Sequence, residues 1–147
     1  TFIPEDESLD FVFTSPPYFG WEAYGDEPEQ SSIKFSTSDM WKDKFLKQTI
    51  ANAYKGLKEG KYLALNVANT KQYKTFEEDT VDLAVEVGFK HTDTWWLSLS
   101  TQQGGIGTFN VEEAQRDEKK QKQQYIGRYE RPNKSGRKYE PTFIFQK

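Results

Sequence analysis

The feature that most constrains this chain is the peptide Ser15-Pro16-Pro17-Tyr18, which follows Thr14 and the apolar run Leu9–Phe13. A short, continuous apolar run is typical of a buried strand in a parallel sheet. Proline has no backbone N–H to donate and biases the residue before it towards an extended conformation, so the prolines end the strand and keep Ser15 extended. We therefore expect the carbonyls around Ser15 at the carboxyl edge of a sheet, where open α/β folds bind ligands.

Tyr18 places an aromatic ring directly beside these backbone acceptors. Hydrogen-bond acceptors next to a stacking surface suit a planar base that carries an exocyclic amino group. The structural alternative is a proline-rich turn between a strand and a loop, and four residues alone do not separate the two interpretations.

The rest of the chain alternates between helix and strand patterns. After an acidic loop at 19–35, we expect a helix from Ser38 to Leu57, ended by Gly60, and then a strand at 62–67. A second helix begins with a capping box at 75–78 and ends at Gly88. Two strands follow at 94–100 and 142–145, the last with Pro141 in its first position. This order predicts an α/β fold with a mainly parallel sheet, helices on its faces and right-handed crossovers.

The Ser-Pro-Pro-Tyr peptide resembles the (Asp/Asn/Ser)-Pro-Pro-(Tyr/Phe) motif of the amino-group DNA methyltransferases, which methylate N6 of adenine or N4 of cytosine. Other segments resemble the family in the same order along the chain: 10–14, 19–25, 57–67 and 139–147. The resemblance implies a partial Rossmann-like methyltransferase fold, in which the last strand is antiparallel and lies between its two predecessors.

The resemblance also implies roles for individual residues. Ser15-Pro16-Pro17-Tyr18 would be catalytic: the Ser15 side chain and the Pro16 carbonyl accept the amino hydrogens of the base, and Tyr18 stacks on its ring. Thr14 and Ser15 would contact the methyl donor, S-adenosylmethionine, and Phe19 would pack around a base flipped out of DNA. Ser in the first motif position slightly favours cytosine N4 over adenine N6.

The family's Phe-x-Gly-x-Gly cofactor loop has no clear counterpart in this chain. The nearest candidate, Gln103–Gly107, precedes a segment that is almost wholly polar and could not pack on a sheet, so we interpret it as a flexible loop. The chain is therefore expected to be the catalytic half of a larger enzyme. The edge of its first strand would then be covered by the missing cofactor-binding segment or by a second copy of the chain.

Charge is distributed unevenly along the chain, although the net charge is only −3. Residues 1–30 contain eight acidic residues and no Lys or Arg, whereas 116–138 contain nine basic residues interleaved with tyrosines. These basic residues are Arg116, Lys119, Lys120, Lys122, Arg128, Arg131, Lys134, Arg137 and Lys138. The region 101–138 is interpreted as a long loop or insertion, which either contacts the nucleic-acid backbone or is a solvated, disordered segment.

Composition limits the other possibilities. The chain has no Cys and a single His, His91, so we expect no disulfide, no metal site and no Ser-His-Asp triad. Only 35% of residues are hydrophobic but 16% are aromatic, so large rings must supply much of the core. With no signal peptide or transmembrane run, we expect one soluble, cytoplasmic domain over 1–147. A non-catalytic nucleic-acid-binding module is the alternative function.

Overall fold

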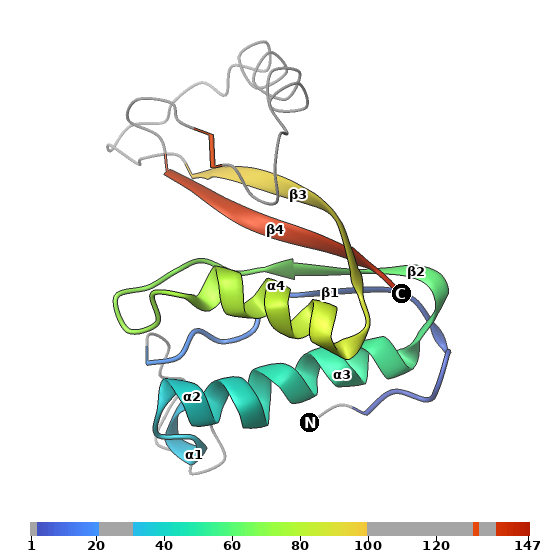
Figure 1. Cartoon of the computed structure of the whole chain (residues 1–147), viewed down its shortest axis with the longest axis horizontal. Coiled ribbons are helices and arrows are strands. Elements are labelled where there is room, and N and C mark those ends of the chain that lie inside the picture. The colour runs from blue at the N-terminus through green and yellow to red at the C-terminus, as the bar shows by residue number, and fades with distance from the viewer. Residues whose placement is uncertain (1–2, 21–30, 100–130, 133–137) are drawn as a thin grey trace, which may run out of the picture.

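The computed structural model describes residues 3–20, 31–99, 131–132 and 138–147, which form a layered α/β fold (Figure 1). Its elements, in chain order, are β1 (Leu9–Thr14), α1 (Ser31–Lys34), α2 (Ser38–Trp41), the π-helical turn η1 (Lys42–Leu46), α3 (Lys47–Gly56), β2 (Leu57–Asn66), α4 (Phe76–Val87), β3 (Lys90–Leu99) and β4 (Lys138–Gln146). None of the helices in the described ranges has both the length and the apolar character needed to cross a membrane.

The four strands form one sheet in the order β1-β2-β4-β3. β1 pairs with β2 in parallel, while β4 is antiparallel to both β2 and β3. The predicted sheet is thus confirmed, including the insertion of an antiparallel last strand between its two predecessors. Because β4 runs the opposite way, its start lies at the same sheet edge as the carboxyl ends of β1, β2 and β3.

The core lies between the sheet and the helices α3 and α4, which pack on one of its faces. Aromatic rings contribute strongly to it, as the composition predicted. The largest fully buried side chains are Trp41, Phe76, Phe143, Phe145, Leu46, Ile50, Leu57, Leu63 and Leu65.

The opposite face of the sheet carries exposed apolar side chains. Phe11 and Phe13 of β1 are 56% and 61% exposed, and Trp95 of β3 is 58% exposed. Side chains alternate along a strand, so Val12 points to the helices while its two neighbours point away. The interpretation of the run Leu9–Phe13 as a buried strand is therefore wrong on this face, for the part of the chain that the structure describes.

The long helix predicted after Ser38 is interrupted and ends earlier than expected. Its middle is the π-helical turn η1, and the last helical residue is Gly56 rather than a residue beside Gly60. A Cβ atom at Gly56 would lie 2.4 Å from Cγ of Pro4, so close packing explains this glycine. Gly60 does have a left-handed conformation, with φ of 74°, but it lies inside β2.

Three further local predictions need correction. Pro141 lies inside β4, not in its first position. Its carbonyl accepts from the N–H of Val67, the residue after β2, so the N–H that proline lacks would face the end of β2 and not its middle. The hydroxyl of Thr75 does not cap the backbone of α4 but donates to Asp79 Oδ2 at 2.8 Å. α1 also occupies part of the stretch predicted to be a loop.

Candidate active site at the carboxyl edge of the sheet

The Ser-Pro-Pro-Tyr motif leaves β1 at the carboxyl edge of the sheet, as predicted. Pro16 is buried, while Pro17 and Tyr18 are half-buried and Ser15 is exposed. Thr14, the last residue of β1, pairs with Leu65 of β2. The buried proline anchors the peptide to the fold, and its neighbours remain accessible at the edge.

The ring of Tyr18 rests on an aromatic cluster under the motif. Its centroid is 5.5 Å from that of Phe76, the first residue of α4, with the rings perpendicular. Phe76 in turn stacks on Tyr73 at 5.1 Å and meets Trp41 edge-on at 5.5 Å. Such edge-to-face contacts hold rings in defined orientations, so Tyr18 is supported from below by buried side chains.

Phe19 points towards this cluster as well. Its ring centroid is 6.2 Å from that of Trp41, and the side chain is half-buried. The contact supports an anchoring role for Phe19, beside the predicted contact with a flipped base. The neighbouring Trp21 and Tyr24 lie outside the described residues.

Trp41 is the centre of the cluster and was not identified as a site residue from the sequence. It is fully buried, and its indole N–H donates to Ser31 Oγ at 3.1 Å. Besides Phe76 and Phe19, it contacts Phe45 at 5.1 Å and Tyr73 at 6.1 Å. It lies within the helix predicted from Ser38 to Leu57, but only the tertiary structure brings it into the ring cluster that supports Tyr18.

The hydroxyl of Tyr73 donates to Asp79 Oδ2 at 2.8 Å. Burial raises the pKa of Tyr73, and the hydrogen bond to Asp79 raises it further. Above about pH 10 the unfolded chain loses the Tyr73 proton while the folded chain retains it. Stability is therefore expected to fall as pH rises through this range.

Replacing Tyr73 by Phe tests this pH dependence. The variant loses one hydrogen bond, which is expected to lower stability by about 1 kcal/mol at neutral pH. It should also lose stability less steeply than the natural chain between about pH 9 and 11, as measured by urea unfolding. Equal slopes for the two proteins would show that Tyr73 does not contribute to alkaline unfolding.

An ion pair between a buried carboxylate and an exposed guanidinium group lies beside the aromatic cluster and was missed entirely from the sequence. Glu77, the second residue of α4, accepts from Nη2 of Arg131 at 2.6 Å. The sequence offered no signal for this pairing, because Glu77 is typical of an exposed first helical turn and Arg131 belongs to a basic stretch.

The structure describes little else of the predicted nucleic-acid contacts. Lys138 contributes its backbone to β4. The candidate loop Gln103–Gly107 lies outside the described residues. So do the other basic residues predicted to contact nucleic acid: Lys119, Lys120, Lys122, Arg128, Lys134 and Arg137.

The single histidine is held within the sheet. Nε2 of His91 lies 2.9 Å from both the carbonyl oxygen of Asp93 and Oγ1 of Thr94, and its ring packs against Phe143 and Phe145. These contacts support a structural role for His91.

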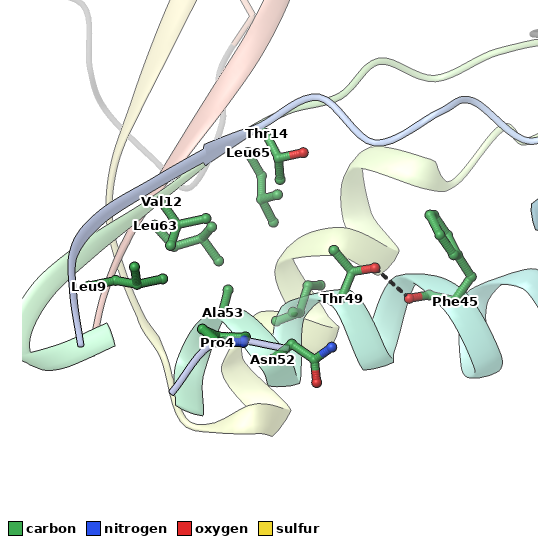
Figure 2. Close-up of a pocket in the computed structure, with 11 residues that line it drawn as sticks. Pro4, Leu9, Val12, Thr14, Phe45, Thr49, Asn52, Ala53, Leu63 and Leu65 are labelled. Carbon is green, nitrogen blue, oxygen red and sulfur yellow. Dashed lines mark hydrogen bonds between the residues drawn. The ribbon is translucent and has the colours of Figure 1, made fainter. Parts of the chain in front are cut away.

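A cavity of about 340 Å³ opens between β1 and α3, on the helix side of the sheet (Figure 2). Leu9 and Val12 point into it from β1, opposite Ala53 of α3, and Thr14 lies at its upper end. Its walls are almost wholly apolar, which makes it a packing surface rather than a polar binding site. The other lining residues are Pro4, Phe45, Thr49, Ile50, Asn52, Leu63 and Leu65.

Comparisons with known proteins show a likeness in structure. No protein-family model matches the sequence, and no curated protein matches it significantly. The crystal structure of a protein from Thermus thermophilus, assigned as a DNA modification methylase and complexed with S-adenosyl-L-methionine, is similar to this chain with a TM-score of 0.51 and 15% sequence identity.

The similarity covers 97% of this chain but only 49% of the Thermus protein. The chain therefore spans about half the length of the protein it matches. At this level of identity the likeness shows the fold alone: a mixed α/β fold, which in this chain has an antiparallel last strand.

Proposed function

We propose that this chain is the catalytic half of an S-adenosylmethionine-dependent enzyme that methylates an exocyclic amino group of a flipped DNA base. The observation that carries the proposal is the position of the Ser15–Tyr18 peptide. It lies at the carboxyl edge of the sheet, with the Tyr18 ring supported by Phe76. The fold is shared with a protein complexed with S-adenosylmethionine, which makes methyl transfer the best-supported chemistry.

The motif has the chemical groups that an aromatic amine requires. The lone pair of an exocyclic nitrogen is delocalised into the ring, so the nitrogen is a poor nucleophile. In our proposal the Ser15 side chain and the Pro16 carbonyl accept the amino hydrogens and orient the lone pair, while Tyr18 stacks on the base. Catalysis by these residues is thus mainly alignment of the reacting atoms.

In our proposal the methyl donor lies on the side of β1 that is the edge of the described sheet. Thr14 ends the edge strand, and Ser15 beside it is exposed, so both residues can be reached from that side. When bound, S-adenosylmethionine supplies the methyl group. Thr14 and Ser15 would form one wall of its site, and the rest would come from a cofactor-binding half.

The position and the composition of β1 indicate where a cofactor-binding half would join this chain. β1 is an edge strand, yet it presents exposed Phe11 and Phe13 on one face and the apolar cavity beside Leu9 and Val12 on the other. A strand that is apolar on both faces is typical of the interior of a sheet covered by helices on both sides. We therefore expect a cofactor-binding half to pair with β1 and to cover both apolar surfaces.

Sedimentation and hydrogen exchange of the 147-residue chain test this arrangement. We expect a monomer whose β1 amides exchange faster than those of β2 and β4, because the β1 edge is open. A concentration-dependent dimer in which the β1 amides are protected would contradict it, since a second copy of the chain would then cover the edge.

The function itself is tested by cofactor titration and by base binding. The isolated chain is expected to bind S-adenosylmethionine only weakly in calorimetry, because half of the site is absent, but to retain an unstacked base in a mismatched duplex. For the complete enzyme, transfer of a labelled methyl group to duplex DNA should yield N4-methylcytosine, with N6-methyladenine as the other amino-group product. Methylated RNA beside unmethylated DNA would overturn the proposal.

The alternative function, a non-catalytic nucleic-acid-binding module, predicts a different pattern. Binding would be salt-sensitive and independent of Tyr18, and replacing Lys119, Lys120 and Lys122 by Ala would weaken it for all sequences. That result would favour the module over the catalytic half.

A further inference from the structure

Glu77 is a buried carboxylate whose charge partner comes from a distant part of the sequence. It is 6% exposed, and its Oε1 accepts from Nη2 of Arg131 at 2.6 Å and from the backbone N–H of Asn69 at 3.1 Å. Nη1 of Arg131 donates to the carbonyl oxygen of Tyr139. Arg131 therefore bridges the first turn of α4 and the start of β4.

The geometry of this bridge requires a guanidinium group. Cζ of Arg131 lies 5.3 Å from the ring centroid of Trp96 on β3, while the two terminal nitrogens donate hydrogen bonds to different acceptors. A planar fork can stack on an aromatic ring and donate in two directions at once, which a Lys ammonium cannot reproduce. A buried carboxylate without such a partner would be strongly destabilising.

The ion pair is connected to the motif through α4. Glu77 directly follows Phe76, the ring on which Tyr18 rests at 5.5 Å. The N–H of Glu77 also donates to Asn69 Oδ1 at 2.8 Å, so the loop after β2 and the first turn of α4 hold each other reciprocally. The loop after β2, the first turn of α4 and, through Arg131, the start of β4 are thus joined at Glu77, the residue next to the ring that Tyr18 contacts.

We infer that Glu77 and Arg131 are a positioning pair, which holds the first turn of α4, and through Phe76 the ring of Tyr18, against the start of β4. The inference rests on the proposed function in one respect only, namely that the ligand of Tyr18 is a base. It changes the role expected for Arg131: both terminal nitrogens are engaged within the chain, so Arg131 acts as an internal anchor rather than as a phosphate contact.

A double-mutant cycle on stability tests the pairing. We expect Arg131→Ala, Glu77→Ala and the double variant to show a coupling of at least tenfold in the unfolding equilibrium constant, or about 1.4 kcal/mol. The pair Lys47–Glu86 is a matched control, because its atoms are 2.7 Å apart and Lys47, at 42%, is about as exposed as Arg131, at 46%. The carboxylates differ: the side chain of Glu86 is 60% exposed and that of Glu77 only 8%. The coupling of the control pair should stay below about fivefold.

Fluorine NMR tests the positioning of Tyr18 without any assay of activity. The chain is labelled with 3-fluorotyrosine, and the Tyr18 resonance is assigned as the one that is absent from the spectrum of the Tyr18→Phe variant. Arg131→Lys, which retains charge and is the variant most certain to fold, should shift that resonance, and Lys47→Ala should not. A shift in stability without a shift of the Tyr18 resonance would show that the pair is merely structural and would overturn the inference.

DNA binding separates this inference from the proposed function. If Arg131 contacts a phosphate, Arg131→Ala should reduce the slope of log K for DNA binding against log salt concentration by about one. That outcome would also overturn the inference. An unchanged salt dependence supports the anchor. If the chain binds no DNA at all, the proposed function fails, while the cycle and the NMR shift still decide the role of Glu77 and Arg131.

Discussion

Replacing Trp41 by Ala is expected to lower the free energy of unfolding by ~3–5 kcal/mol. The indole is fully buried and contacts four aromatic rings, so its removal leaves a large cavity that its neighbours cannot refill. The variant also leaves Ser31 Oγ without its indole donor. Urea unfolding followed by circular dichroism measures the effect.

Two variants sharpen this experiment. Trp41→Phe keeps an aromatic ring in the cluster and should cost clearly less than Trp41→Ala. Trp95 is the matched control, because it is 58% exposed and Trp95→Ala should change stability only slightly. Equal losses for Trp41→Ala and Trp95→Ala would show that the aromatic cluster is not the centre of the core.

Tyr18→Ala is expected to weaken retention of an unstacked base by about 10- to 100-fold, because stacking of one base on an aromatic ring contributes ~1–3 kcal/mol. Fluorescence of 2-aminopurine placed at a mismatch in duplex DNA reports the effect, since the fluorescence rises when the base leaves the stack. A mismatched base is the least costly to flip, so the isolated chain should suffice for this measurement.

Matched controls separate stacking from folding and from non-specific contact. Tyr18→Phe keeps the ring and should retain most of the binding, whereas Tyr62→Ala removes an exposed ring on the far face of the sheet and should have no effect. If Tyr18→Ala binds as well as the natural chain, Tyr18 is not a stacking residue and the proposed function loses its main support.

The two predictions are physically linked. Trp41 and Tyr18 belong to the same ring cluster, since both pack edge-on against Phe76. Loss of the Trp41 indole should therefore loosen Tyr18 as well as the core. Trp41→Ala is expected to weaken base retention even under conditions in which the variant remains folded.

Much of the fold was predictable because it depends on local patterns. The apolar run before the motif indicated β1, and the helix and strand periodicities indicated the α/β class. Helix ends were predicted less well, because they depend on contacts from elsewhere. Gly56 rather than a residue beside Gly60 is the last residue of α3, and Pro4 packs on it too closely for a side chain.

The amino-acid sequence by itself determined the strand, the prolines that end it and the extended conformation of Ser15 between them, because each depends on the conformational limits of adjacent residues. Only the tertiary structure decided what supports that motif. Glu77 and Arg131 are separated by 54 positions, and no local pattern pairs them. Likewise, the exposure of Phe11 and Phe13 depends on which elements pack on each face of the sheet, and strand periodicity does not contain that information.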